Sequence, residues 1–450
     1  MKSFEITGTW WIPNKPENKV HGTLKYNASN GGELEVIGLL QESPQVISNE
    51  NVFQNEDLIL GLAEGRPITC YKCRQIHSSL FLNHVSEHKI VYDIEFIFAG
   101  YHFLEKNDIL FDEFSINYSN LGSWLLDFPI YFDERFNIST NEVNISFKNQ
   151  KNEMKLYESP EFVLFLISDL KYSRSINSRS LNQITYFKIL SMNTLHFKDW
   201  MDGILFDMKK FITLSLDVPI YPISIEGKRN DHKTIHDFNK IERLLPIEIF
   251  YKTNHSIEKV YPSNVLFSYK DIKENTPLFF NNWFRISRDL SPMINLYIAN
   301  IEQSIKILEF QFLNLAEAIE IYHRRTFDES TYVELPLFDE LSAAMCEIVK
   351  NKIENNDARN TLIKKIEYMN QHSLRRRIKD VLRKLKKYDY LDWEDPECKL
   401  LGDKISEQRD ILTHYEKERA DKLDYKELSE YTMQAREIVR KCISYELLND

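Results

Sequence analysis

The chain has 450 residues, of which 43% are hydrophobic and 28% are charged, with only 12 Gly against 28 Phe and 23 Tyr. This length favours two or three domains, and the apolar and aromatic content excludes a disordered chain. The net charge of −11 argues against a protein that coats duplex nucleic acid, although a local basic groove is compatible with it.

Targeting signals are absent from the sequence. No stretch approaches the ~18 consecutive apolar residues of a membrane span, and the N-terminus has no run that resembles a signal sequence. Five cysteines, few and odd in number, are typical of reduced thiols and not of a disulfide framework. We therefore expect a cytoplasmic protein without a membrane span.

Residues 1–290 are expected to form a β-rich body that contains some helix, with a sub-boundary near 190. Apolar and polar residues alternate in short runs, which is typical of half-buried strands, at 91–96, 114–118 and 143–147. Polar and glycine-containing turns separate these runs. The period then changes to three or four residues, and this predicts one amphipathic helix near 194–216.

Residues 295–450 are expected to form an all-helical bundle, so the predicted fold class is α+β multidomain. One long helix is predicted from a continuous apolar stripe at Ile301, Ile305, Leu308, Phe312, Leu315, Ile319 and Tyr322. Further helices are predicted near 336–355, 358–369, 373–388 and 403–416. Asp424 and Glu427 form a capping-box pattern that begins the last helix.

The residues best suited to chemistry lie near the end of this bundle. Arg409 and His414 are separated by four residues, and Asp410 follows the Arg. Metal-free RNA cleavage requires proton transfers and stabilisation of a charged phosphorane. A His can handle the protons and an Arg can hold the phosphate. The residue types therefore suit phosphodiester transesterification, whereas the alternative is a solvated pair on a helix surface.

Helix geometry constrains this pair. Residues five apart lie roughly 140° apart around a straight helix, so Arg409 and His414 of one copy do not converge. Asp410 and His414 share a face, and the carboxylate can orient the imidazole. An active site built where two copies meet would bring the groups together, so we expect a symmetric homodimer. A second loose Arg/His pattern, from Arg229 to His236, lies in a polar stretch between probable strands, and we interpret it as a coincidence.

A basic segment is the second candidate site. Eight of the thirteen residues from Arg375 to Lys387 are basic, and apolar residues on the opposite side leave a cationic helix face. This face is a candidate RNA-backbone surface, and the alternative is a solvated face balanced by the acidic run 392–395. The predicted RNA-binding residues are Arg375, Arg376, Lys379, Arg383 and Lys387.

Two further patterns concern the N-terminal body. Cys70, Cys73, His84 and His88 have nearly the spacing of a zinc site. Cys70 and Cys73 would point to opposite faces of a strand unless the backbone bends there, so no metal site is assigned. Trp10 and Trp11 are interpreted as core and rim of the first sheet, with a base-stacking platform as the alternative.

The C-terminal region resembles the HEPN superfamily of helical ribonucleases, whose signature is Arg, four to six residues, then His. The stretch Leu315–His323 is similar to the first helix of that family, and Arg409 and His414 match its catalytic positions. The whole chain resembles the ApeA-type anti-phage HEPN proteins. That resemblance rests on the N-terminal segments Gly8–Pro13 and His21–Leu24, and on Phe111–Phe114 followed by Leu121–Leu125.

The resemblance implies a metal-independent endoribonuclease of abortive infection, without a cofactor, with transfer RNA among the candidate substrates. The HEPN domain, 295–450, would dimerise and cleave RNA, while the body at 1–290 would sense a phage-derived trigger. The rival hypothesis is a non-enzymatic HEPN-like module that binds a nucleotide or a partner. A metal-dependent nuclease is a third hypothesis, and the absence of an evident carboxylate and His cluster in the bundle counts against it.

Overall fold

The computed structural model describes residues 1–41, 55–81, 87–125, 132–137, 142–147, 152–175, 178–236, 241–253, 257–303, 306–414 and 424–449. The chain divides into two compact units, Met1–Phe280 and Asn281–Asp450. The first is rich in strands and the second is all-helical, which confirms the predicted fold class.

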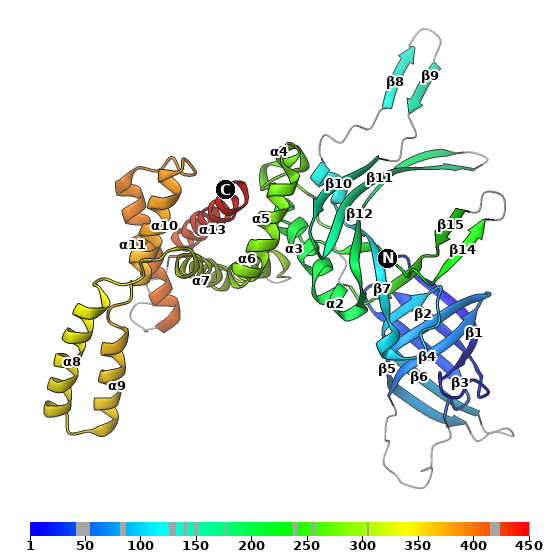
Figure 1. Ribbon diagram of the computed structural model, residues 1–450, viewed down its shortest axis with the longest axis horizontal. Coiled ribbons are helices and arrows are strands. Elements are labelled where there is room, and N and C mark those ends of the chain that lie inside the picture. The colour runs from blue at the N-terminus through cyan, green and yellow to red at the C-terminus, as the bar shows by residue number, and fades with distance from the viewer. Residues whose placement is uncertain are drawn as a thin grey trace. The chain divides into compact units, whose positions relative to one another are not determined.

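The N-terminal strands close into a six-stranded antiparallel barrel (Figure 1). Its strands are β1 (Phe4–Trp11), β2 (Val20–Asn27), β3 (Gly31–Ile37), β4 (Glu56–Ala63), β5 (Arg66–Phe81) and β6 (Glu87–Ala99). Alternating side chains of these strands fill the interior. Trp10 lies there fully buried, and its Nε1 donates to the Gly22 carbonyl at 3.0 Å. Trp11 is also buried, with 9% exposure, and its ring packs against His102 and Lys19. The prediction of Trp10 as a core residue is therefore confirmed, whereas Trp11 is more buried than the predicted rim residue.

The long strand β6 joins this barrel to a second sheet. Its first half pairs with β3 and its last residues pair with β16, while β5 follows its other edge. The second sheet has the order β10-β11-β12-β7-β13-β16-β6. Its other strands are β7 (Leu110–Tyr118), β10 (Asn152–Glu158), β11 (Phe162–Arg174), β12 (Arg179–His196), β13 (Pro222–Lys228) and β16 (Ile247–Tyr251). Two separate hairpins are β8 (Phe132–Asn137) with β9 (Glu142–Phe147), and β14 (Lys233–His236) with β15 (Ile241–Leu244).

Short helices accompany the second sheet: α1 (Leu121–Leu125), α2 (Phe197–Asp202), α3 (Ile204–Leu216) and α4 (Tyr269–Ile272), with 3-10 turns at Lys106–Asp108 and Pro262–Asn264. The prediction of one helix over 194–216 is wrong, because β12 continues to His196 and Gly203 separates α2 from α3. Of the residues that gave the three-to-four-residue period, Phe197, Met208 and Ile212 are buried and Met201 and Ile204 are half-buried, so the period still marks the inward face of both helices.

The helical unit contains α5 (Thr276–Asp289, which begins in the first unit), α6 (Ser291–Glu302), α7 (Leu308–Thr326), α8 (Leu335–Lys352), α9 (Asn356–Tyr368), α10 (Leu374–Lys387), α11 (Asp395–His414) and α13 (Tyr425–Leu448). The Asp424 carboxylate accepts from the backbone N–H groups of Lys426 and Glu427, so the predicted start of the last helix is confirmed. None of the helices in the described part of the chain is long and apolar enough to cross a membrane.

The single long helix predicted over 301–322 is wrong. α6 ends at Glu302 and α7 begins at Leu308, and the two helices pack against each other. Asn300 donates to the Gln311 carbonyl at 2.9 Å, and Asn314 donates to the Asn300 side chain at 2.7 Å. The apolar stripe is continuous in sequence because both helices bury it in one core.

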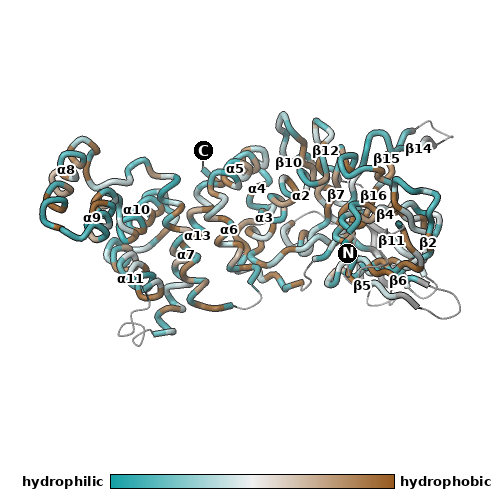
Figure 2. The backbone as a smooth tube through the Cα atoms, turned by 90° about the horizontal axis from the view of Figure 1, so that it is seen from below, coloured by the Kyte–Doolittle hydropathy of each residue, from teal (hydrophilic) through white to brown (hydrophobic). Residues whose placement is uncertain are grey.

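The bundle core is built from α7, α10, α11 and α13. α10 and α11 form an antiparallel pair, as the ion pairs Lys386–Asp395 at 2.6 Å and Lys379–Asp403 at 2.5 Å show. The alternation of hydrophilic and hydrophobic residues along α10 can be followed in Figure 2. α8 and α9 form a hairpin inserted between α7 and α10, and α8 has no buried residue.

Candidate active site

Arg409 and His414 lie at the C-terminal end of α11, which continues helically to His414. The roughly 140° gap expected for helical residues five apart therefore applies to them. The Arg409 side chain is 38% exposed, and its Nη1 donates to Asp410 Oδ1 at 3.3 Å. Thr413 caps the Arg409 carbonyl through its hydroxyl. His414 is exposed and is the last residue described before the segment 415–423.

The Asp410 carboxylate contacts Arg409 in the described part of the chain, not His414. The two residues share a helix face as predicted, since both lie in α11 four positions apart. Rotation of the exposed Asp410 side chain would bring it to His414. The role of Asp410 as an orienting carboxylate stays a prediction.

The register of α10 and α11 places the Arg/His pair beside the beginning of α10. Asp403 lies against Arg375 and Lys379 in the first turns of α10. Arg409 lies six residues further on, about 9 Å along the axis. Because the two helices are antiparallel, moving from Asp403 toward Arg409 along α11 means moving toward the N-terminal end of α10. That end is capped by Ser373, whose hydroxyl accepts from the Arg376 backbone N–H. Of the basic segment, Arg375 and Arg376 at the start of α10 therefore lie toward the candidate catalytic residues, whereas Arg383 and Lys387 lie toward the opposite end of the α10–α11 pair, where Lys386 contacts Asp395.

The basic face of α10 is largely paired with carboxylates. Arg375 and Lys379 share Asp403, at 3.3 and 2.5 Å. Arg376 and Arg383 share Asp380, at 3.0 and 3.3 Å. The fifth predicted residue, Lys387, lies 5.4 Å from the ring centroid of Tyr388. Four of the five are exposed: the side chains of Arg375, Arg376 and Arg383 are 56%, 46% and 65% exposed, and Lys387 is exposed as well. RNA binding by this face stays a prediction.

A buried polar cluster between α7 and α10 was missed by sequence reasoning. It contains His323, His372, Arg377 and Asp380, of which His323 is fully buried and Arg377 is 1% exposed. Asp380 Oδ2 lies 3.5 Å from His323 Nε2 and 3.7 Å from His372 Nδ1. Arg377 Nη1 lies 3.2 Å from His323 Nδ1, and Arg377 Nε donates to the His372 carbonyl at 2.9 Å.

This cluster corrects two expectations from the sequence. Arg377 was expected on the cationic face of the helix, and no cluster of carboxylate and His side chains was expected in the bundle. Arg377 instead occupies the apolar side of α10, four residues before Val381, and this spacing was the available signal. The two histidines and Asp380 are 49 and 8 residues apart in sequence order, and only the packing of α7 on α10 brings them together.

Burial governs the charge of these groups. It lowers the pKa of His323 to about 4, with the neighbouring Arg377 cation adding to the effect and Asp380 opposing it. Burial also lowers the pKa of Arg377, and the nearby Arg324 acts in the same direction. His323 is therefore neutral near pH 7, and its imidazole can only serve as one donor and one acceptor.

Comparison with known families matches both halves of the chain. The ApeA N-terminal domain 1 profile matches residues 5–283, and the ApeA-like HEPN profile matches residues 313–447. The chain belongs to the ApeA family. Neither the curated proteins nor the solved structures give a match. Helices α7, α10, α11 and α13 lie within the ApeA-like HEPN match, as do the Arg409–His414 pair and the buried cluster.

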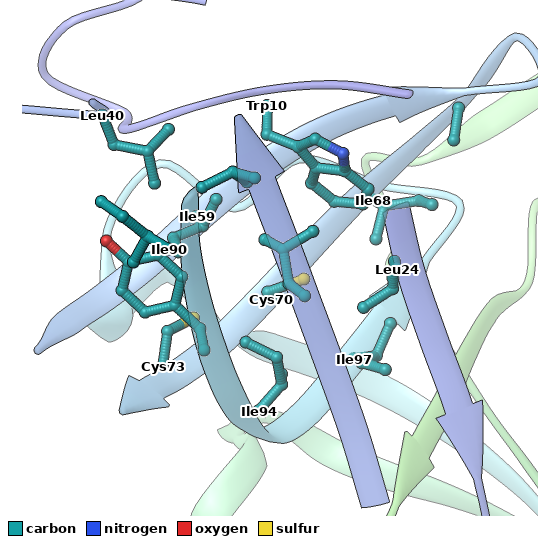
Figure 3. Close-up of a cluster of buried hydrophobic side chains, with 14 of the residues drawn as sticks. Trp10, Leu24, Leu40, Ile59, Ile68, Cys70, Cys73, Ile90, Ile94 and Ile97 are labelled. Atoms are coloured by element: carbon teal, nitrogen blue, oxygen red, sulfur yellow. The ribbon is translucent and has the colours of Figure 1, made fainter. Parts of the chain in front are cut away.

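In the ApeA N-terminal domain, Cys70 and Cys73 both project into the barrel core (Figure 3). A regular strand would place them on opposite faces, but the backbone bend that the sequence analysis allowed for is present in β5. Lys72 between them adopts a left-handed φ of 56°, which breaks the alternation. Burial raises the pKa of both thiols, which disfavours the thiolate form that zinc needs. His88 lies in β6, while His84 lies outside the described residues.

In the second Arg/His pattern, from Arg229 to His236 in the ApeA N-terminal domain, the arginine is engaged in contacts within the fold. The Arg229 side chain is 10% exposed, pairs with Asp231 at 2.8 Å and donates to the Asp108 carbonyl at 2.6 Å. Its guanidinium also lies 5.0 Å from the Tyr101 ring centroid. Arg229 therefore has no free N–H fork to offer a phosphate, in contrast to Arg409, whose side chain is 38% exposed.

Proposed function

We propose that this ApeA-family protein is a metal-independent endoribonuclease that acts in anti-phage abortive infection. The observation that carries the proposal is the position of Arg409 and His414. His414 is exposed and Arg409 is half-buried at one helix end inside the ApeA-like HEPN domain, in the Arg-x4-His spacing. The residues that such chemistry needs are accessible there to a large substrate.

Each side chain has a role in transesterification. The exposed imidazole of His414 would take the proton of the 2′-hydroxyl or return one to the leaving 5′-oxygen. Arg409 would hold the scissile phosphate and stabilise the additional negative charge of the phosphorane. The products would be a 2′,3′-cyclic phosphate and a 5′-hydroxyl. Asp410 would pair with Arg409 in the absence of RNA. When the RNA phosphate binds Arg409 instead, the Asp410 carboxylate would become available to orient the His414 imidazole.

The proposal includes a homodimer formed through the HEPN domain. Because Arg409 and His414 diverge on α11, we infer that an Arg and a His from two copies face one scissile phosphate. The N-terminal unit would receive a phage-derived trigger and regulate how the two bundles pair. RNA, with transfer RNA among the candidates, is the proposed substrate.

The decisive experiment incubates the purified full chain with total RNA in EDTA. Wild type should cleave, and His414→Ala should not. Glu407→Ala serves as a matched control, because Glu407 is an exposed residue of the same helix that pairs only with Lys404 among the described contacts. The control should cleave like wild type and leave cyclic phosphate ends.

Two outcomes would contradict the proposal. Activity that EDTA abolishes and magnesium restores would assign the reaction to a metal-dependent nuclease. RNA cleavage that His414→Ala retains in full would make the Arg/His pair a surface feature, as the rival binding-module hypothesis requires.

A further inference from the structure

Asp380 is the centre of the buried cluster and also its link to the surface. Its Oδ2 contacts Arg376 Nε at 3.0 Å and faces His323 Nε2 and His372 Nδ1 at 3.5 and 3.7 Å. Its Oδ1 contacts Arg383 Nη1 at 3.3 Å. The Asp380 side chain is 13% exposed, so histidines contact it from inside the bundle and arginines from outside.

The protonation of His323 follows from its other neighbour. Arg377 Nη1 carries only donor hydrogens and lies 3.2 Å from His323 Nδ1, so Nδ1 must accept. A neutral His323 then carries its proton on Nε2, the atom that faces Asp380. In the described part of the chain, His323 Nε2 and His372 Nδ1 have no hydrogen-bond partner that is closer than this carboxylate. The Asp380 carboxylate is thus the nearest charged group that both buried nitrogens face, at distances longer than an ordinary hydrogen bond.

The same atoms are arranged as metal ligands would be. One atom each of His323, His372 and Asp380 lies within 4.8 Å of the other two. Two features disfavour a metal. The acceptor state of His323 Nδ1 leaves a proton where a metal would bind. Arg376 and Arg383 already contact the carboxylate and Arg377 contacts His323, so a dication would add positive charge to a positive site.

We propose that Asp380 is a positioning residue that presents Arg376 and Arg383 as a paired phosphate clamp for the RNA substrate. The inference rests on the proposed function. Arg376 contacts the carboxylate through Nε and Arg383 through Nη1, so each guanidinium retains further N–H groups for a phosphate. The carboxylate between them offsets their mutual repulsion before RNA binds. The buried histidines and Arg377 keep the carboxylate in place, and the clamp is therefore preorganised.

The direction in which Asp380→Asn changes RNA affinity distinguishes a positioning role of Asp380 from a purely electrostatic one. If Asp380 only diluted the positive field of α10, its removal would strengthen RNA binding, because one negative charge would leave the surface. If Asp380 positions the two arginines, Asp380→Asn should weaken RNA binding even though the net charge becomes more positive. The two hypotheses therefore predict opposite changes in affinity.

The experiment measures the dissociation constant of RNA over a salt series in full-length protein carrying His414→Ala, so that cleavage does not interfere. Asp380→Asn should weaken binding by about five- to tenfold and reduce the salt slope. Asp395→Asn is the matched control, because Asp395, the first residue of α11, is 87% exposed and pairs with the basic residue Lys386 of α10. The control should bind as tightly as the parent, or more tightly.

A second variant keeps the test valid if Asp380→Asn destabilises the bundle. Arg376→Lys with Arg383→Lys changes two exposed side chains, preserves charge and removes the guanidinium forks. This variant should lose affinity to a similar extent, and adding Asp380→Asn to it should cost little more. RNA binding equal to the parent in the double Lys variant would overturn the clamp.

Three results would contradict the proposal in different ways. Tighter RNA binding by Asp380→Asn would reduce Asp380 to a screening charge, while cleavage by the wild-type protein would leave the proposed function standing. Failure of the wild-type protein to bind or cleave RNA would contradict both the Asp380 proposal and the proposed ribonuclease function. A rise in thermal stability on adding Zn²⁺ that His372→Gln abolishes would assign the cluster to a metal.

Discussion

Mixing two inactive variants tests whether the active site is shared between chains. Arg409→Ala removes the proposed phosphate ligand and His414→Ala removes the proposed proton-transfer group. His414 is exposed and Arg409 is half-buried, and neither residue lies in the buried core of the bundle. The structure places them about 140° apart around α11 and about 7.5 Å apart along its axis. If one copy does not present both groups to one phosphate, the proposed active site needs a second copy related by a two-fold axis.

The expected activity follows from random pairing. In an equal mixture, about half of the dimers contain one chain of each variant, and each such dimer has one site with an intact Arg and an intact His. The mixture should therefore show about one quarter of the wild-type rate. A site within one chain predicts no activity above that of the parents. An equal mixture of wild type with the double variant gives about one quarter for a shared site and about one half for a site within one chain.

The assay is RNA cleavage after subunit exchange, with two different affinity tags to purify the mixed dimers. Glu407→Ala mixed with wild type controls for exchange itself and should retain full activity. Purified mixed dimers of Arg409→Ala and His414→Ala that show no activity would refute the shared site. The angular argument from α11 would then be wrong, and another residue would have to complete each site.

Three further predictions follow from the bundle. Substituting Arg376, Lys379 and Arg383 together by Ala should weaken RNA binding and lower its salt slope by about 0.7 for each lost phosphate contact, as fluorescence titration would show; an unchanged slope would make α10 a solvated face. The pKa of His323 is about 4 in the folded protein against an ordinary 6.5, so the unfolded chain binds the proton more readily. The contribution of His323 to the free energy of unfolding is therefore fully present above pH 6.5 and is lost as the pH falls toward 4. Denaturant titration should show about 2 kcal/mol of lost stability from this group between about pH 7.5 and about pH 5, and His323→Gln should flatten that dependence, whereas equal dependence in both proteins would contradict the shift. Inserting a side chain with Gly61→Val should destabilise the barrel strongly, because a Cβ there would lie 2.2 Å from the Trp10 ring, and a thermal midpoint equal to wild type would contradict that packing.

Local patterns predicted much of the fold. The alternating runs at 91–96, 114–118 and 143–147 lie in β6, β7 and β9, and the helices expected from 336 onward correspond to α8, α9, α10, α11 and α13. These predictions depend only on how side chains repeat along one element, and neighbouring residues carry that information. The break at Gln303 was not predicted, because two packed helices and one long helix bury the same apolar stripe.

The candidate site divides in the same way. The sequence by itself determined the Arg409–His414 motif, its helical spacing and the divergence of the pair, since these depend on residues within two turns of α11. Only the tertiary structure decided that β5 and β6 close a barrel with Cys70 and Cys73 inside, and that acids from α10 and α11 neutralise the basic face. It alone gathered His323, His372, Arg377 and Asp380, because contacts between α7 and α10 join residues about 50 positions apart. The spacing of residues along one helix does not predict this cluster, because the burial and charge of its members depend on how α7 and α10 pack against each other.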